Sequence, residues 1–306
     1  MDTAINWLLA GDVSIQYLAH KYLLNSDQST LHGLRKRIAA EGWGRRFLEM
    51  RNPSGHWGRA FYQPKWISTH YTLLDLRYLE IEPVDPIMVT LMLILNPKKS
   101  ADGSIRASQS RPSGDVCING MFLNYASFFG MQEEQLRSVI DYLLENIMPD
   151  GGFNCEGETR GARHSSMHTT LSVLEGMWEF IKAGYTYRLD DLAQARIDAE
   201  EFLLMHRLFK SDKTGEPINR NWTMLSFPSR WFYDILKALV YFADAGRIYD
   251  PRMQDALDVL ISKQRKDGTW PVQAKHPGQV HFDLEQTGEP SRFNTLRALR
   301  VLNKYG

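Results

Sequence analysis

The sequence predicts an all-α fold in which about six helix–turn–helix repeats close into an α/α toroid. Two observations predict this fold: glycine turns recur at an even spacing, and the segments between them carry apolar residues three and four positions apart. A third observation favours a closed ring. An open solenoid needs polar capping repeats, and both ends of this chain resemble ordinary repeats.

Four short polar turns share one pattern, a central glycine followed two residues later by a large apolar residue. They read RNPSGHW, KSADGSI, IMPDGGF and QRKDGTW, with central glycines Gly55, Gly103, Gly151 and Gly268. The first two intervals between these glycines are equal, and the last is long enough for two periods, with Gly215 inside it. Equal periods of this length indicate a repeated supersecondary unit.

The segments between the turns fall into two helical types. Outer helices are predicted over 85–95, 133–147, 192–209 and 250–264, before the turns. Inner helices are predicted after the turns and near the start of the chain, over 11–24, 68–81, 115–130, 165–181, 230–246 and 291–306. Strand-like alternation is scarce, so the whole chain, 1–306, is expected to form one toroid domain.

The composition excludes several classes of function. Lys and Arg together number 36, as do Asp and Glu, so a zero net charge argues against a nucleic-acid partner. The most apolar stretch, IMVTLMLILN, is far shorter than the ~20 residues that span a bilayer, so no stable membrane insertion is expected. The first residues do not form a signal peptide, and two cysteines build no disulfide framework. We therefore expect a cytoplasmic protein.

The first turns of the predicted inner helices are unusually polar for a buried layer. This pattern predicts a deep pocket with a polar rim and an apolar interior, ringed by helix N-termini that favour anions. Helix caps and turn formers account for Ser, Thr and Asn taken singly, but less well for His, Cys, Tyr and Arg. The rim residues with functional side chains include His70, Asp115, Cys117, His164, His168, Arg230, Tyr233, Asp234, Arg292 and Asn294.

The turn QRKDGTW, with Gln264, Gly268 and Trp270, resembles the Q-x-x-x-G-x-W element of squalene and triterpene cyclases. The toroid is similar to that of the terpenoid cyclase and protein prenyltransferase β-subunit superfamily. The resemblance covers nearly the whole chain and suggests an atypical, bacterial-type single-chain member. It implies small-molecule chemistry on an isoprenoid or other apolar substrate, in a central cavity. Prenyltransferases also need a partner subunit, which nothing in this sequence identifies.

The resemblance further implies a zinc site. Prenyltransferases hold zinc with an Asp-x-Cys pair that opens one inner helix and a His in a His-Thr context that opens a later one. Here GDVCING supplies Asp115 and Cys117, and SSMHTTL supplies His168 one repeat later. Three protein ligands would leave an open catalytic position, whereas Cys155 as a fourth ligand would make the site structural.

On this hypothesis the protein is a zinc-dependent prenyltransferase-like or terpenoid cyclase-like enzyme. The acid–base or orienting candidates are His70, His164, Tyr233 and Asp234. The candidate substrate-binding residues are Arg111, Arg230, Arg292 and Asn294, with Trp57, Trp66, Phe122 and Trp231 lining the cavity. The acidic D-x-D-D run with which cyclases protonate their substrate is missing, so cyclisation by that route is not expected.

Two alternatives remain open at this point. One is a non-catalytic toroid that binds a lipid or a protein. The other is a polysaccharide lyase-like toroid, in which Asn119 or Asn294, His70 or His164, Tyr233 and Arg230 surround a cleft. A lyase needs an open polar groove and a cyclase a closed apolar cavity, so the polarity of the central space separates these functions.

Overall fold

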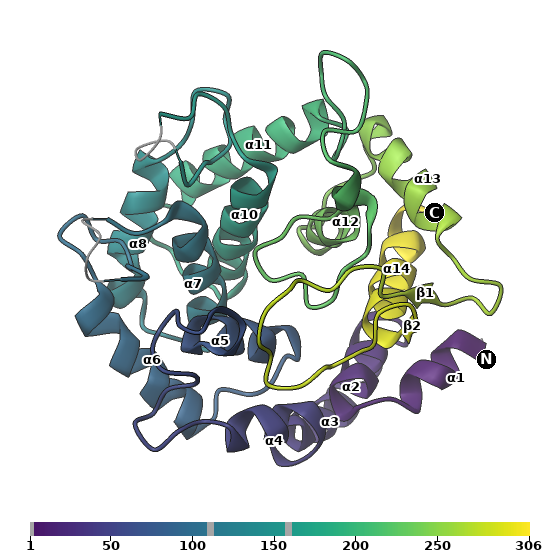
Figure 1. Cartoon of the computed structure of the whole chain (residues 1–306), viewed down its shortest axis with the longest axis horizontal. Coiled ribbons are helices and arrows are strands. Elements are labelled where there is room, and N and C mark those ends of the chain that lie inside the picture. The colour runs from purple at the N-terminus through teal and green to yellow at the C-terminus, as the bar shows by residue number, and fades with distance from the viewer. Residues whose placement is uncertain (1–2, 109–112, 157–160) are drawn as a thin grey trace.

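The computed structural model describes residues 3–108, 113–156 and 161–306, and its helices form a closed ring (Figure 1). The inner helices are α2 (Val13–Tyr22), α5 (Thr69–Tyr78), α7 (Val116–Phe128), α10 (Met167–Lys182), α12 (Ile235–Asp244) and α14 (Arg292–Tyr305). The outer helices are α1 (Thr3–Leu9), α3 (Gln28–Ala40), α4 (Gly42–Glu49), α6 (Asp85–Lys98), α8 (Glu133–Glu145), α11 (Leu189–Met205) and α13 (Gln254–Ser262). The predicted all-α toroid is confirmed.

Short elements complete the described chain. Single 3₁₀ turns occur at Lys65–Ile67, Arg220–Thr223 and Pro251–Met253. The strands β1 (Trp270–Pro271) and β2 (Pro290–Ser291) pair antiparallel just before α14, with Trp270 opposite Ser291. This pair fixes both ends of the long connecting segment, 272–289, which crosses the middle of the ring in Figure 1. We call it the covering segment.

The ring closes where α14 packs against both α12 and α2. The Arg292 side chain donates from Nε to the Trp7 carbonyl at 3.1 Å, and its guanidinium lies over the Trp7 ring at 4.4 Å. Further along α14, Arg300 lies 3.7 Å from the ring centroid of Tyr22 on α2. These contacts join the last inner helix to the first two helices, so the two chain ends lie on the same side of the ring (Figure 1).

The four glycine turns have one geometry, as their shared sequence pattern predicts. Each central glycine has a φ between 83° and 86°, a left-handed conformation that side chains other than glycine rarely adopt. The apolar residue that closes each turn is fully buried. Its backbone N–H donates to a polar side chain in the first turn of the next inner helix: Trp57 to Thr69 at 3.1 Å, Ile105 to Asn119 at 2.7 Å, Phe153 to Thr170 at 3.0 Å and Trp270 to Thr295 at 2.9 Å.

These hydrogen bonds, which we call the turn clasps, explain much of the polarity that the sequence places at the inner-helix N-termini. The clasping Thr and Asn side chains are buried and face the turn that precedes them. A buried N–H without a partner would be costly, so a hydroxyl or amide oxygen is needed at this position of each repeat. The rim polarity is therefore largely structural.

The outer layer departs from the sequence prediction in its first quarter. Helices α1, α3 and α4 occupy a stretch for which no outer helix was predicted. In α3 only Ile38 is buried, so the segment lacks the apolar periodicity that marks the other outer helices. Asp27 caps α3 by accepting from the Thr30 N–H at 2.9 Å, and α3 packs on α2. Capping and tertiary contact thus form this helix.

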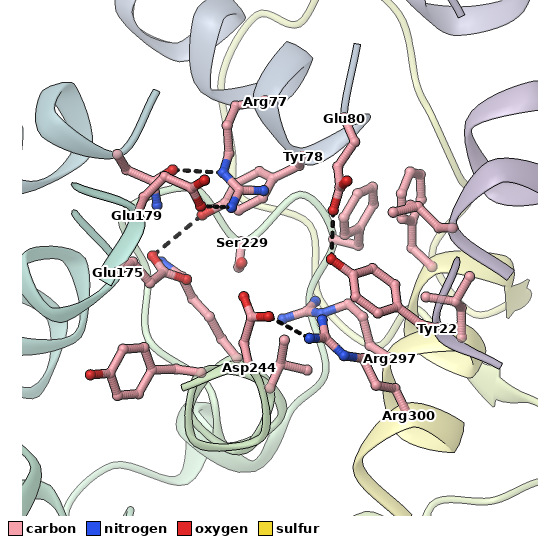
Figure 2. Close-up of a pocket in the computed structure, with 18 of the residues that line it drawn as sticks. Tyr22, Arg77, Tyr78, Glu80, Glu175, Glu179, Ser229, Asp244, Arg297 and Arg300 are labelled. Carbon is pink, nitrogen blue, oxygen red and sulfur yellow. Dashed lines mark hydrogen bonds and ion pairs between the residues drawn. The ribbon is translucent and has the colours of Figure 1, made fainter. Parts of the chain in front are cut away.

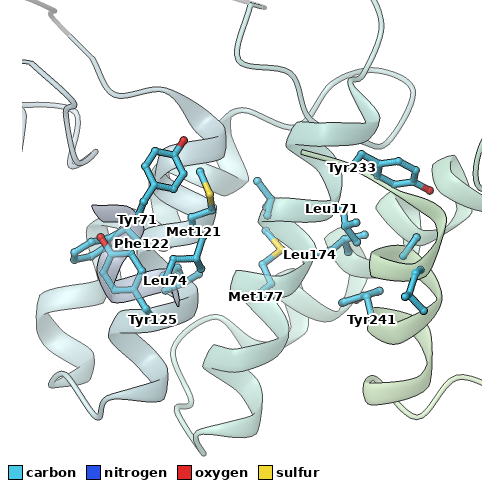
Figure 3. Close-up of a cluster of buried hydrophobic side chains, with 14 of the residues drawn as sticks. Tyr71, Leu74, Met121, Phe122, Tyr125, Leu171, Leu174, Met177, Tyr233 and Tyr241 are labelled. Atoms are coloured by element: carbon cyan, nitrogen blue, oxygen red, sulfur yellow. The ribbon is translucent and has the colours of Figure 1, made fainter. Parts of the chain in front are cut away.

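The apolar faces of the inner helices fill the ring interior. Figure 3 shows Leu74 of α5, Met121 and Phe122 of α7, and Leu174 and Met177 of α10 within one buried cluster. These side chains pack against each other instead of lining an empty space. The sequence predicts a deep apolar cavity, whereas the described apolar side chains form a packed core that leaves only small cavities on the ring axis.

Helices α7 and α10 approach each other more closely than side chains would allow. A Cβ added to Gly176 would lie 2.3 Å from the Gly120 carbonyl oxygen, and one added to Gly120 would lie 2.7 Å from the backbone of Val173. Two glycines on facing inner helices therefore set the spacing of this pair. This explains why an inner helix tolerates a residue that disfavours helices.

We expect Gly176→Ala to lower the free energy of unfolding by about 1–3 kcal/mol, because the new methyl group meets rigid backbone. Urea unfolding measures this loss. Gly33→Ala is the matched control, since Gly33 lies in α3 with no atom within 4 Å of the added Cβ. That change should be neutral or stabilising by about 0.4–1 kcal/mol. Equal effects at the two glycines would contradict the close packing of α7 and α10.

Across residues 3–108, 113–156 and 161–306, no helix combines the length and the hydrophobicity that crossing a bilayer requires.

Candidate functional site

Two cavities lie on the ring axis, separated by the segment 227–230. Phe227 lines both cavities, whereas Ser229 lines only one and Arg230 only the other. Phe227 is held by stacking on Phe293 of α14 at a centroid distance of 3.8 Å. Lys237 of α12 donates to the Arg230 carbonyl at 2.7 Å and so fixes the other end of the segment. We call this segment the septum.

The first cavity, named here the lower cavity, has a volume of about 100 Å³ and is shown in Figure 2. All six inner helices contribute to its lining, together with the septum. Its charged residues are Arg77, Glu80, Glu175, Glu179, Lys237, Asp244, Arg297 and Arg300. Four carboxylates and four cations thus line the space that was expected to be apolar.

Most of these charges are paired. Arg77 bonds to Glu179, Lys237 lies 3.1 Å from Glu175, and Arg300 lies 2.5 Å from Asp244. Glu80 pairs with Lys21 of α2 and accepts from the Tyr22 hydroxyl at 2.7 Å. Although burial acts to raise it, the pKa of Glu80 is lowered to about 2, because Lys21 and Arg77 stabilise its charge. Glu80 is therefore ionised at neutral pH.

The second cavity lies between the septum, α5 and the covering segment, and we call it the Asp75 pocket. Its volume is about 20 Å³. Asp75 of α5 and Arg230 of the septum are 2% and 5% exposed, and the Arg230 Nη2 lies 3.2 Å from the Asp75 Oδ2. His276 and His281 enter from the covering segment, and His281 Nε2 lies 2.9 Å from the Thr72 hydroxyl.

The Asp75 pocket holds several groups with shifted pKa values. Burial raises the pKa of Asp75, and Arg230 opposes this only in part. Burial, with help from Arg230, lowers the pKa values of His276 and His281 to about 4, so both rings are neutral at pH 7. Glu285, also in the lining, has its pKa raised by burial. Perturbed pKa values cluster at functional sites, which makes the Asp75 pocket a candidate site.

Aromatic side chains surround Arg230 above the pocket. Its guanidinium lies 4.9 Å from the Trp66 ring centroid, and the Phe232 ring stacks on His276 at 3.6 Å. Lys65 lies between Trp66 and Trp231, at 4.7 Å and 4.8 Å from their rings. These residues form what we call the aromatic cluster, in which cations contact aromatic faces.

The three predicted zinc ligands do not form a metal centre. In the described part of the chain, no three His, Cys, Asp or Glu side chains are grouped so that they could share a metal ion. His168 Nδ1 accepts from the Tyr233 N–H at 2.8 Å, and Nε2 faces the Trp222 indole nitrogen at 3.4 Å. Both ring nitrogens of His168 are therefore engaged by N–H donors, the Tyr233 backbone at Nδ1 and the Trp222 indole at Nε2.

The other two predicted ligands are engaged elsewhere. Asp115 is the N-terminal flanking residue of α7, and Cys117 donates its backbone N–H to the Cys155 sulfur at 3.0 Å. The two thiols hydrogen-bond to each other, and Cys155 also accepts from Thr169 at 3.4 Å. The residues as placed do not fit zinc, and the zinc site stays a prediction on which no step below depends.

The four predicted catalytic residues do not converge. His70 is fully buried, bonded through Nδ1 to the Tyr125 hydroxyl at 3.1 Å, whereas the His164 side chain is 83% exposed beside Asp150. Tyr233 donates its hydroxyl to the Leu208 carbonyl. Asp234 caps α12 by accepting from the Lys237 N–H at 2.8 Å. Tyr233 and Asp234 thus have structural partners, whereas His164 is exposed and His70 Nε2 is buried without a hydrogen-bond partner among the described residues.

The predicted binding residues divide into two groups. Trp66, Arg230 and Trp231 meet in the aromatic cluster. The others serve the fold: Arg292 holds α1, Asn294 donates to the Pro271 carbonyl at 3.0 Å, and Trp57 and Phe122 are fully buried core residues. Arg111 lies outside the described residues. Among the residues predicted for a lyase, only Arg230 lines the Asp75 pocket. Asn119 forms the turn clasp with Ile105.

Sequence reasoning missed most of the charged residues on the axis. The signal was present, since charged residues such as Asp75, Arg77, Glu175 and Arg297 interrupt the apolar faces of the inner helices. A charge within an otherwise apolar helix face is costly unless it is paired or functional. His276 and His281 had no such signal, because they lie in a loop without periodicity.

We expect the free energy of unfolding to fall as the pH is lowered from about 6.5 to about 4. Burial lowers the pKa of His70 to about 3 in the folded protein, against a normal value of 6.5. Over this pH window His70 is protonated in the unfolded chain but stays neutral in the folded protein. The free energy of unfolding therefore falls by roughly 3 kcal/mol. Urea unfolding across the pH series measures the slope. His70→Gln should reduce it, and an unchanged slope would contradict the neutral, buried His70.

Comparisons with known proteins identify no family. No protein-family model matches the chain, and no curated protein does. Among solved structures, the chain is similar to a polysaccharide lyase, at 12% identity over 95% of this chain and 88% of that chain, with a TM-score of 0.49. It is also similar to the type II terpene cyclase MstE from Scytonema in complex with merosterolic acid A, at 14% identity over 95% and 97%, with a TM-score of 0.35. MstE with geranylgeranyl dihydroxybenzoate matches at 12% identity over 95% and 98%, with a TM-score of 0.34. Scores at this level carry no functional argument, and the toroid assignment rests on the ring itself.

Proposed function

We propose that the protein is an acid–base enzyme that binds a sugar carboxylate, of the uronate class, in the Asp75 pocket. One observation carries this proposal: three polar atoms of the pocket lining are buried without a hydrogen-bond partner in the described residues. They are Asp75 Oδ1, Arg230 Nε and His276 Nε2. Buried polar atoms in folded proteins almost always have partners. Three exceptions around one pocket favour a ligand with matching groups.

The three atoms define the ligand chemistry. The free edge of the Arg230 guanidinium is complementary to a carboxylate. Asp75 Oδ1 is a free acceptor, suited to a hydroxyl or to a proton taken from carbon. Neutral His276 offers either a donor or an acceptor. A hydroxylated carboxylate meets all three requirements, whereas an isoprenoid chain meets none of them.

This arrangement suits β-elimination. Arg230 on the substrate carboxylate would stabilise the negative charge that develops when the neighbouring C–H bond breaks. Asp75 would take that proton, and its raised pKa makes it a better base than an exposed aspartate. The electron pair forms a C=C bond as the C–O bond one carbon further breaks. Protonated Asp75 would then give its proton to the departing oxygen, while neutral His276 hydrogen-bonds to that oxygen, which gives an alcohol and an unsaturated carboxylate.

Substrate entry requires the covering segment to move. At about 20 Å³ the pocket has room for a single water molecule, and the covering segment closes it. The tip of this segment is exposed, and the Trp66 indole holds it by donating to the Pro277 carbonyl at 2.6 Å. We infer that the segment opens from this tip, because β1 and β2 fix its ends.

The test is turnover of uronate oligosaccharides, followed by the ultraviolet absorbance of the unsaturated product. The wild type should form product, and Asp75→Asn should abolish it while keeping the pocket's shape. His164→Gln is the control, because His164 is exposed and lies outside the pocket. Binding without product would indicate a binding protein. No binding of any uronate would overturn the proposal.

A second candidate is the terpenoid-type function that the resemblance implies, with an isoprenoid as substrate. The aromatic cluster favours it, because Trp66 and Trp231 already hold cations on their faces and aromatic faces stabilise cationic intermediates. Incubation with geranylgeranyl diphosphate, with and without added zinc, tests it. A new hydrocarbon or terpenoid alcohol, with release of diphosphate, would support this candidate, and unchanged substrate under both conditions would exclude it for this substrate.

A further inference from the structure

We propose that the lower cavity is a second ligand site, which binds a small oxyanion such as a carboxylate or a phosphate. It is separated from the Asp75 pocket by the septum and does not depend on the proposed function. The proposal starts from charge. The ion-paired network around the cavity contains four carboxylates: Glu80, Glu175, Glu179 and Asp244. Six cations face them: Lys21, Arg77, Lys182, Lys237, Arg297 and Arg300.

Arg297 is the cation of this network that has no ion pair among the described residues. It lines the cavity, yet among the described residues it has no carboxylate within ion-pair distance. Its only polar contact in that part of the chain is the Asn294 amide oxygen at 3.5 Å, which is at the limit of a hydrogen bond. An inward-facing guanidinium with five N–H donors is thus almost unused.

Helix dipoles account for some of the other cations but not for Arg297. Arg77 and Lys182 lie in the last turns of their helices, where the negative end of the dipole stabilises positive charge. Arg297 lies in the second turn of α14, far from its C-terminus at Tyr305. Neither a carboxylate nor a helix end accounts for its charge, so an anionic ligand is the partner that fits.

Two neutral donors face the same space. The Trp178 indole N–H is buried without a hydrogen-bond partner among the described residues, and Trp178 lines the cavity. The Ser229 hydroxyl, on a residue 3% exposed, points into the cavity from the septum (Figure 2). One cation with most of its donors unused and two uncharged donors match the several oxygen atoms of an oxyanion.

The size of the cavity restricts the ligand. About 100 Å³ holds a few water molecules, well below the ~300–1,000 Å³ typical of drug-sized ligands. A dicarboxylate or a phosphate fits this space, whereas a nucleotide or a lipid does not. The site also contacts the septum, because Lys237 joins Glu175 of the cavity to the Arg230 carbonyl.

Isothermal titration of the whole protein with inorganic phosphate and with succinate tests the proposal, at constant ionic strength. The wild type should bind at least one of them, and the arm that binds identifies phosphate or carboxylate as the ligand chemistry. Arg297→Gln should weaken binding by at least roughly tenfold, as expected for loss of a charge-assisted hydrogen bond. Trp178→Phe, which removes only the indole N–H among polar groups, should weaken it severalfold.

Two controls make the result specific. Arg45→Gln removes the same charge from an exposed pair on α4 and should leave binding unchanged. Asp75→Asn should also leave it unchanged, which distinguishes this site from the Asp75 pocket. No binding of either anion to the wild type would overturn the proposal. So would equal binding by wild type and Arg297→Gln, or a loss that Arg45→Gln shares.

Discussion

Arg230→Met is expected to lower the free energy of unfolding by about 3–5 kcal/mol at pH 7, because it leaves the Asp75 carboxylate buried without its cation. Asp75 is 2% exposed, and its described ion pair is with Arg230 alone. Methionine keeps much of the side-chain volume, so the loss reports mainly on charge. Urea unfolding of the purified variant measures it.

The double variant Asp75→Asn/Arg230→Met is the control for this prediction. It also loses the contact between Arg230 and Trp66, so its difference from Arg230→Met isolates the unpaired carboxylate. We expect the double variant to recover a large part of the lost stability. If the single and double variants unfold at the same urea concentration, Asp75 and Arg230 are not a coupled buried pair.

Glu179→Gln is expected to cost about 3 kcal/mol, the second large effect. Glu179 accepts from Arg77 and lies 2.9 Å from Lys182, and its side chain is 4% exposed. Without the carboxylate, the Arg77 guanidinium, whose side chain is 11% exposed, stays buried beside the lower cavity with no carboxylate within ion-pair distance among the described residues. Thermal and urea unfolding both report this loss.

Glu41→Gln provides the comparison, because Glu41 pairs with Arg37 on the surface, where both side chains are nearly half exposed. Exposed pairs contribute about 0–1 kcal/mol. Each variant replaces one glutamate carboxylate with an amide, and the two glutamates differ in burial. Similar losses in both would contradict the view that the lower cavity is built on buried ion pairs.

The ring was predictable from the sequence because its two periodic signals are independent and agree. The glycine turns fix the repeat, and each of the six predicted inner helices is present with its bounds shifted by a few residues. Each turn also needs a partner for a buried N–H, which places Thr69, Asn119, Thr170 and Thr295 in the first turns of their helices. Helices such as α3 escaped prediction because one buried residue leaves no periodic pattern.

The site was harder to predict, for two physical reasons. Polar residues at the inner-helix N-termini suggested a binding rim, but Asn119 and Asp234 satisfy backbone groups there. The charges that do face the axis lie deeper, and most of them pair with a helix distant in sequence, as Arg77 does with Glu179. Sequence spacing reveals a shared helix face, but it does not reveal which faces meet across a ring.

The most direct measurement is a crystal structure of Asp75→Asn soaked with glucuronate. We expect the sugar carboxylate within hydrogen-bond distance of Arg230 Nε, a ring hydroxyl near His276 Nε2, and the covering segment displaced from the closed position. That result would establish the Asp75 pocket as the ligand site. Glucuronate bound elsewhere, or a covering segment still closed over the pocket at saturating ligand, would contradict it.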